Sequence, residues 1–173
     1  MEDIIRQIQQ GVQANLYLLA LYAALPLPDI CGAVESPDGV ATGQKYRNWY
    51  NKYVFPRYNF LTAEECYDFR CKLLHQGQTR AKNANSYYSH VAFAEPGLNR
   101  PKLNFGTSGI HGQSGPGPKS IEVVDFINAL IYGVISWQFE KRGTEPFEKN
   151  MKLCLRRREE GIAGLLTGVP YIY

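Results

Sequence analysis

The sequence lacks several patterns that would assign a protein to a class at once. Its four cysteines, in 173 residues, form neither a CxxC pair nor a spacing typical of secreted disulfide scaffolds. It has no Gly-Lys-Ser/Thr phosphate loop and no Gly-x-Ser-x-Gly nucleophile motif. These absences argue against a disulfide framework, a zinc ribbon and the nucleotide-binding and hydrolase classes that those motifs define.

Long apolar runs are also scarce. The longest, residues 12–27, is shorter than the ~18 residues of a membrane-spanning helix and has the length of a signal-peptide core. The residues before it carry Glu2 and Asp3 against Arg6, whereas a signal peptide begins with a positive region. The cysteines are most simply explained as reduced thiols, which are typical of the cytoplasm. We therefore expect a cytoplasmic protein with no membrane partner.

Neither sign of charge dominates the chain, but the charge is unevenly spread. The 19 Lys and Arg against 16 Asp and Glu give +3, and 45% hydrophobic residues fit one globular domain, residues 1–173. Residues 70–119 hold seven basic residues and one acidic residue, a net +6, against −3 for the remainder, and they contain all three histidines. This segment is the first candidate for binding RNA or another anion, with a solvated basic loop as the alternative.

The apolar spacing predicts a mainly α-helical bundle of about five helices, with a small β-hairpin insertion at about residues 88–118. The strands expected in that hairpin are residues 89–95 and 102–107, followed by a mobile loop, and residues 29–43 are expected as a loop. The expected helices are residues 3–25, 45–54, 62–76, 121–142 and 144 to the basic run 156–158.

Local signals fix several of these helix ends. Thr62 and Glu65 form a capping box, Gly77 suits the left-handed residue that ends a helix, and Ser120 can cap the long helix after it. In the second helix, four aromatic residues recur at helical spacing, which favours a core or interface stripe over a cofactor site. They are Tyr46, Trp49, Tyr50 and Tyr53.

The string RCKLLHQG places Arg70 and His75 late in the third expected helix, with four residues between them. Arginine binds phosphate in a planar, bidentate manner, and histidine exchanges protons near neutral pH. The pair could cleave RNA without a metal, with His75 as base or acid and Arg70 stabilising charge on the phosphorus oxygens. Five helical steps separate the two by about 140°, so a joint site needs a distorted last turn or pairing across a dimer axis. The alternatives are nucleotide or RNA binding without cleavage, and a purely structural role at the helix end.

This string resembles the motif of the HEPN family, compact helical bundles whose ribonuclease members carry Arg and His separated by four to six residues. The resemblance covers the helical two-thirds of the chain. It implies an RNA-directed protein, a metal-independent endoribonuclease with Arg70 and His75 as catalytic pair, and a composite site at a homodimer interface. Four nearby polar residues are expected to bind nucleic acid. They are Lys72, Gln76, Arg80 and Lys82.

The motif departs from the family pattern at two places. Cys71 stands where many catalytic members have Asn, Asp or His after the arginine. Gly77 stands where the subgroup that works with nucleotidyltransferase partners has Tyr, which disfavours that subgroup. An interaction module of another class, formed by the aromatic stripe and the apolar tail 164–173, is the main functional alternative.

The remaining candidates are weaker. Asp29, Cys31 and Glu35 could approach a site from their expected loop, but loop acids and a buried thiol explain them equally well. His90 and His111 lie 21 positions apart with no carboxylate nearby, so we expect no metal and no cofactor. The basic run 156–158 is followed by two glutamates and indicates a solvated helix end.

Overall fold

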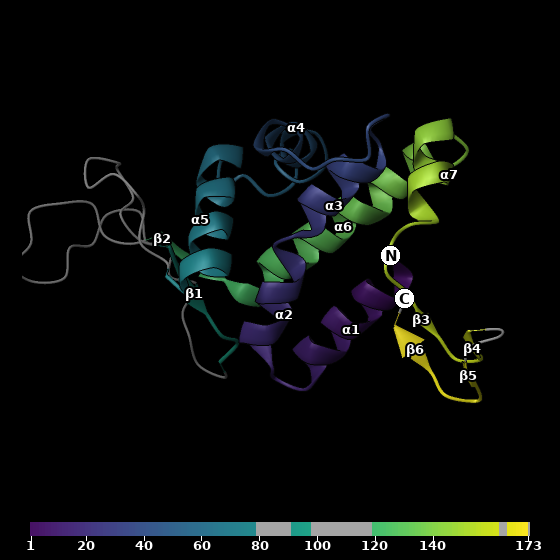
Figure 1. Cartoon of the computed structure of the whole chain (residues 1–173). Helices are drawn as coiled ribbons and strands as arrows, with labels where there is room; N and C mark the ends of the chain where they lie inside the picture. The colour runs from purple at the N-terminus through teal and green to yellow at the C-terminus, as the bar shows by residue number, and fades with distance from the viewer. Residues whose placement is uncertain (79–90, 98–118, 163–165, 173) are drawn as a thin grey trace, which may run out of the picture.

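The fold is mainly α-helical, as predicted. The computed structural model describes residues 1–78, 91–97, 119–162 and 166–172, in which helices form one body and short strand pairs lie at two sides of it (Figure 1). The helices are α1 (Glu2–Gln13), α2 (Tyr17–Ala24), α3 (Leu27–Val34), α4 (Gly43–Tyr53), α5 (Ala63–Gln76), α6 (Val123–Lys141) and α7 (Glu145–Met151).

The N-terminal helix is divided, where the sequence predicted one helix over residues 3–25. α1 ends at Gln13 and α2 begins at Tyr17 because Asn15 adopts a left-handed φ of 59°, which asparagine tolerates better than most residues. α3 then occupies part of the predicted loop 29–43, which corrects that prediction. Pro26 and Pro28 lie at its N-cap and second position, where a helix needs no amide donor, so they begin a helix as well as end one.

Tyr17–Val34, which spans α2 and α3, has the length and apolar composition of a membrane span, with a mean hydropathy of 1.5. It extends beyond the run 12–27 considered from the sequence. Within the protein 56% of it is buried, and the core helix of a soluble protein meets the same criteria. The run is therefore weak evidence for a membrane span, and the cytoplasmic location stays a prediction.

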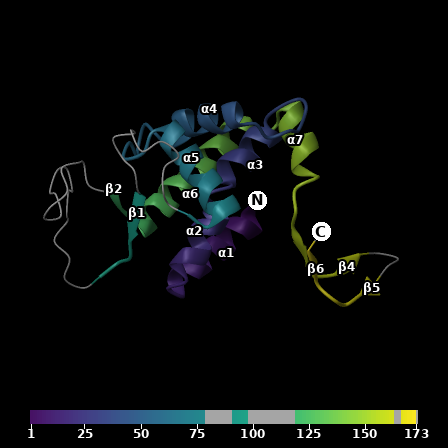
Figure 2. The same ribbon diagram turned by 60° about the vertical axis from the view of Figure 1, so that its left-hand side comes forward.

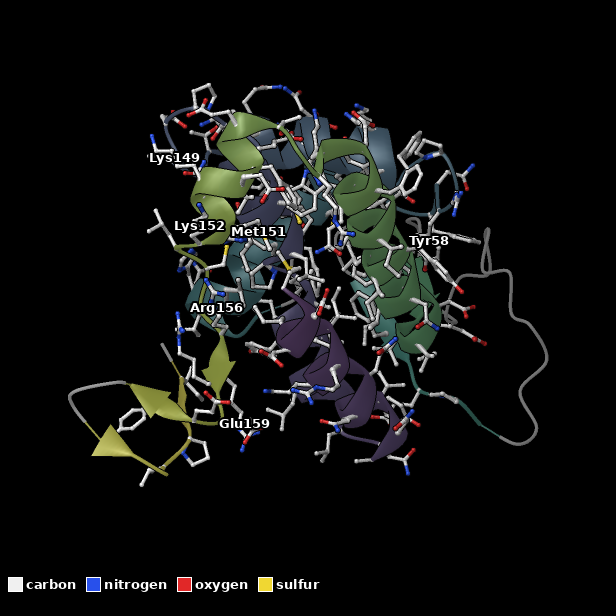
Figure 3. All side chains as sticks on the ribbon, turned by 90° about the vertical axis from the view of Figure 1, so that its right-hand side faces the viewer. Tyr58, Lys149, Met151, Lys152, Arg156 and Glu159 are labelled. Carbon is white, nitrogen blue, oxygen red and sulfur yellow. The ribbon has the colours of Figure 1, made fainter. Side chains whose placement is uncertain are left out.

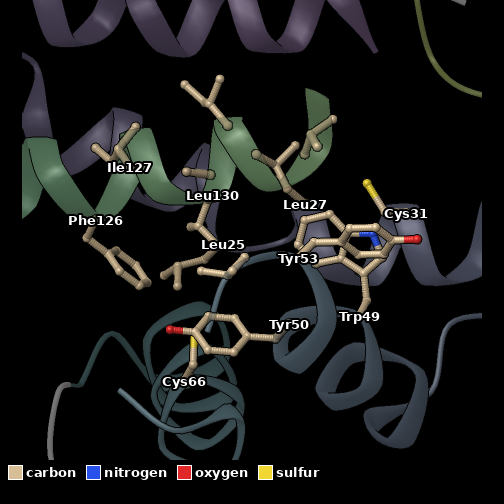
Figure 4. Close-up of a cluster of buried hydrophobic side chains, with 14 of the residues drawn as sticks. Leu25, Leu27, Cys31, Trp49, Tyr50, Tyr53, Cys66, Phe126, Ile127 and Leu130 are labelled. Atoms are coloured by element: carbon tan, nitrogen blue, oxygen red, sulfur yellow. The ribbon is translucent and has the colours of Figure 1, made fainter. Parts of the chain in front are cut away.

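The aromatic stripe of α4 lies in the core, so the core alternative of the prediction is confirmed. All four of its side chains are buried, and in the cluster of Figure 4 Trp49 lies near Cys31 of α3, whereas Tyr50 lies beside Cys66 of α5. A Cβ atom on Gly133 of α6 would come within 2.9 Å of both Trp49 and Val54, so only glycine allows this close approach. This packing fixes α3, α4 and α6 against one another.

α5 has both of its predicted ends. The Glu65 amide donates to Thr62 Oγ1 at 3.2 Å, and the Thr62 amide donates to Glu65 Oε2 at 2.8 Å, which completes the capping box. Gly77 ends the helix with a φ of 62°. The helix that carries Arg70 and His75 is thus defined at both ends.

The strands next to α5 differ from the predicted hairpin. β1 (Val91–Ala94) confirms the first predicted strand, but its described partner is β2 (Lys119–Glu122), and the two run parallel. The second predicted strand, 102–107, lies outside the described residues. Ser120, expected as a helix cap, belongs to β2, and α6 begins at Val123. Phe93 of β1 packs against Phe126 of α6, with ring centroids 5.4 Å apart, which ties the strand pair to the core.

The C-terminal region departs most from the prediction. α7 ends at Met151, not in the basic run 156–158, and its Asn150 side chain donates to the Val34 and Ser36 carbonyls that follow α3. The described strands beyond it are β3 (Arg157–Arg158), β4 (Gly161–Ile162), β5 (Leu166–Thr167) and β6 (Tyr171–Ile172). β3 pairs with β6 and β4 with β5, both antiparallel, and they project from the helical body (Figure 2).

The segment that leads to these strands is exposed. Figure 3 shows Lys152 and Arg156 along the chain that follows α7. Leu153 is 81% exposed, and Ile172 in the described part of the apolar tail is 68% exposed. The side chains of Leu153 and Ile172 therefore do not pack on the bundle of their own chain.

Candidate functional site

Arg70 and His75 meet within one chain at the C-terminal end of α5. Arg70 Nη1 lies 3.5 Å from His75 Nε2, and the helix is continuous from Ala63 to Gln76. The prediction that the pair needs a distorted turn or a second copy is therefore wrong, because the long arginine side chain reaches along the helix. His75 is exposed, whereas the Arg70 side chain is 20% exposed.

The other end of the Arg70 guanidinium pairs with an acid from α3. Arg70 Nη2 lies 2.7 Å from Asp29 Oδ2, and the Asp29 side chain is only 11% exposed. From the sequence, Asp29 was a weak candidate in a loop. The helix-start signal that could have placed it is the pair Pro28 and Asp29, since proline and an acid are typical of a first helical turn.

The surroundings of Asp29 are otherwise neutral. Burial raises the pKa of Asp29 above its ordinary value, although the Arg70 charge acts to lower it. Burial also raises the pKa of Cys66 to about 12 and keeps the pKa of Tyr46 well above 10, so both neighbours are uncharged near neutral pH. Arg70 is therefore the cation that pairs with Asp29 among the described residues.

A second arginine lies on the same side of α5. The Arg47 guanidinium of α4 sits 5.0 Å from the centroid of the Tyr67 ring, a cation–π contact. Tyr67 precedes Arg70 by one helical turn and lies against Gly43, whose added Cβ would be 2.7 Å from the Tyr67 hydroxyl. Sequence reasoning missed Arg47, because only its position in the aromatic helix 45–54 could have suggested it.

The predicted nucleic-acid-binding residues are only partly described. Lys72 Nζ donates to Gln76 Oε1 at 3.1 Å, one turn along α5, and Gln76 is exposed. Arg80 and Lys82 lie outside the described residues, as do His90 and His111. The cationic site that can be described thus consists of the α5 end and Arg47.

No group of three or more His, Cys, Asp or Glu side chains in the described parts of the chain could hold a metal ion. A groove of about 730 Å³ lies between α1 and α2, away from the predicted site residues. Its lining is mostly apolar, with Ile4, Ile8, Gly11, Leu16, Leu19 and Ala20 among its residues. The arrangement at Arg70 and His75 can bind an anion and exchange a proton with side chains alone.

Comparison with known proteins adds no relative: no family model, no curated protein and no solved structure matches this chain. The resemblance to the HEPN family therefore depends on the string RCKLLHQG and on its place in a capped helix of a helical bundle.

Proposed function

We propose that the protein is an RNA-directed, HEPN-like endoribonuclease that needs no metal ion, with Arg70 and His75 as its catalytic pair. The observation that supports this proposal is the 3.5 Å approach of Arg70 Nη1 to His75 Nε2 at the end of α5. The imidazole is exposed and accessible to a substrate, and the guanidinium beside it offers a planar donor for phosphate.

In the proposed reaction His75 removes the proton from a ribose 2′-hydroxyl, and the 2′ oxygen attacks the adjacent phosphorus. The bond from phosphorus to the 5′ oxygen breaks, and the departing oxygen takes up a proton from solvent. The products are a 2′,3′-cyclic phosphate and a 5′-hydroxyl, and no water is consumed. Arg70 stabilises the negative charge that grows on the nonbridging oxygens in the transition state.

The proposal includes a homodimer in the cytoplasm. Each chain carries an adjacent Arg70 and His75, so one copy supplies the pair. The resemblance implies a composite site at the dimer interface. In this protein such a site would bring together two Arg70/His75 pairs, one complete pair from each copy, instead of one pair formed from Arg70 of one copy and His75 of the other. Sedimentation of the purified protein tests the dimer independently of cleavage.

The direct test is cleavage of a labelled single-stranded RNA in EDTA. We expect His75→Ala to lower the rate at least about 100-fold, because general acid–base catalysis contributes about 10²–10⁴-fold. The far-UV spectrum and the oligomeric state should not change, since the side chain is exposed. His90→Ala, a histidine outside the motif, is the matched control. Cleavage that survives His75→Ala, or that requires added metal, contradicts the mechanism.

RNA binding without cleavage is the second candidate, favoured by the state of Arg70. Its charge is paired with Asp29 and its side chain is only 20% exposed, which reduces its attraction for a phosphate. Binding with a salt slope of roughly 0.7 per phosphate contact, without cleavage, would support this candidate. Absence of RNA affinity at low salt would instead favour an interaction module, for which the exposed leucines of the α1–α2 region offer a surface. These are Leu16, Leu18 and Leu19.

A further inference from the structure

The nitrogens of the Arg70 guanidinium have separate surroundings. Nη2 is 2.7 Å from Asp29 Oδ2, at the buried end of the group. Nη1 faces the helix end, 3.5 Å from His75 Nε2 and 3.8 Å from Cys71 Sγ. Arg70 Nε and Asp29 Oδ2 are both buried without a hydrogen-bond partner among the described residues, so the contact of Nη2 with Oδ2 is an ion pair by its short distance. Asp29 therefore holds one end of the planar group, while the opposite nitrogen points at the exposed histidine.

Stability is a poor explanation for the pair of Asp29 and Arg70. Burial raises the pKa of Asp29 even though a full positive charge lies beside it, so the fold disfavours the ionised carboxyl. Its place in the first turn of α3 favours a negative charge but does not remove this penalty. Buried ion pairs often contribute no more to stability than apolar side chains of the same volume. A role in orienting Arg70 accounts for the pair better.

We infer that Asp29 is a positioning residue, which holds Arg70 Nη2 so that Nη1 stays beside His75, where a phosphate of the RNA would bind. The inference rests on the proposed function of Arg70 and His75. A free arginine side chain samples many rotamers, and fixing it before the substrate binds lowers the cost of reaching the transition state. Asp29 itself does not touch the substrate, because its side chain is almost fully covered.

Asp29→Asn tests this role because it keeps the size of the side chain and removes its charge. We expect kcat to fall by about 10- to 100-fold, because Arg70 is no longer held in the productive geometry. KM for RNA should fall, because the released Arg70 charge attracts phosphate more strongly. A purely structural role would lower the amount of active protein without lowering KM. Unchanged kcat in a folded Asp29→Asn variant would overturn the inference.

Glu35→Gln is the matched control. Glu35 lies at the other end of α3, is also mostly covered, and pairs with α6 rather than with Arg70. We expect this variant to be less stable than the wild type but to keep its kcat and KM. Equal losses of kcat in both variants would mean that α3 acts only through stability, which would overturn the positioning role.

A measurement that needs no activity separates this inference from the proposed function. In ¹⁵N spectra of the wild-type protein, the two Nη groups of Arg70 should give separate signals, because the ion pair slows rotation of the guanidinium. Arg70→Lys assigns the signals, and Asp29→Asn should merge them. If the wild type never cleaves RNA, the proposed function fails, and these signals alone decide the positioning role. Merged signals in the wild type would overturn it even if Asp29→Asn does not fold.

Discussion

The two ends of α3 each carry a mostly covered carboxylate that reaches a cation on a distant helix, but the contacts lead to different places. At the C-terminal end, Glu35 Oε2 accepts a hydrogen bond from Trp137 Nε1 at 3.1 Å and lies 3.5 Å from Lys141 Nζ, both on α6. At the N-terminal end, Asp29 pairs with Arg70 on α5, and Nη1 of the same arginine lies 3.5 Å from His75 Nε2.

The two carboxylates therefore differ in what their partners contact next. Trp137 is fully buried, so its hydrogen bond to Glu35 holds α3 against α6 in the interior. The other partner of Glu35, Lys141, is partly exposed and also lies 3.6 Å from the exposed Glu140, so these contacts end in a surface ion-pair group. The contacts of Asp29 lead through Arg70 to an exposed imidazole. In the proposed function, the same residue chemistry thus stabilises the fold at one end of a short helix and positions a group for binding at the other.

The largest effect should come from removing the cation at the Asp29 end of α3, with the cation at the Glu35 end as the comparison. Arg70→Met leaves Asp29 covered and unpaired, so we expect a loss of about 2 kcal/mol in the free energy of unfolding and at least a 100-fold loss of RNA cleavage. Lys141→Met should cost less than about 1 kcal/mol and leave cleavage intact, because Glu35 keeps its bond to Trp137. Urea unfolding and the RNA assay measure both.

The double variant Asp29→Asn/Arg70→Met sharpens that result. It removes both charges, so it should recover part of the stability lost in Arg70→Met without any recovery of cleavage. Equal stability of the single and double variants would show that Asp29 and Arg70 do not interact in solution.

A smaller effect is expected at the Glu35 end of α3. Glu35→Gln keeps an acceptor for Trp137 but loses the charge that strengthens this hydrogen bond and attracts Lys141, so we expect about 1 to 1.5 kcal/mol less stability. Thermal unfolding and RNA cleavage of the same sample measure the two consequences together. A fall in kcat here would remove the distinction between the two ends of α3.

The capping box at the start of α5 tests whether the cleavage rate depends on the stability of the whole helix or only on its C-terminal end. Thr62→Ala breaks the capping box and should cost about 1 kcal/mol. The loss arises at the end of α5 opposite to His75, so the cleavage rate at saturating RNA should not change. Amide hydrogen exchange should show faster exchange in the first turn alone, and faster exchange at Arg70 would contradict the prediction.

The smallest effect is a difference in pH dependence. The folded pKa of Asp29 is raised by burial, so its contribution to stability is present below the unfolded value near 3.9 and is lost as pH rises through the folded pKa. Asp38, beyond the Glu35 end, has a pKa lowered mainly by the hydrogen bond from Lys45, so its contribution is present above the unfolded value and is lost on acidification.

Urea unfolding at several pH values measures this contrast. The stability of the wild type relative to Asp29→Asn should fall as pH rises from about 3 to 7. Relative to Asp38→Asn it should rise over the same interval. Slopes of the same sign would contradict the assignment of the two carboxylates.

Local signals in the sequence predicted α5 and the core, and they failed where two distant segments meet. Thr62, Glu65 and Gly77 act within a few residues of one another, so the ends of α5 could be predicted without the fold. The buried stripe of α4 follows from apolar periodicity in the same way. α3 was not predicted because Pro26 and Pro28 follow the predicted helix 3–25, where prolines suit the end of one helix as well as the start of the next.

The candidate site was predictable as a motif but not as an arrangement. The spacing of Arg70 and His75 is visible in the sequence, whereas their contact depends on the length and rotamer of one side chain. Asp29 is 41 positions away from Arg70, and the two meet only because α4 packs against both α3 and α5. No local pattern carries that information.

The parallel pairing of β1 with β2 makes two segments that are far apart along the chain one cooperative unit. Four register pairs, from Val91 with Lys119 to Ala94 with Glu122, join the segment that follows α5 to the one that leads into α6. Phe93 of β1 also packs against Phe126 at the start of α6. The backbone amides of the two strands should therefore gain and lose protection from solvent together, so a substitution that weakens β1 should expose the amides of β2 as well.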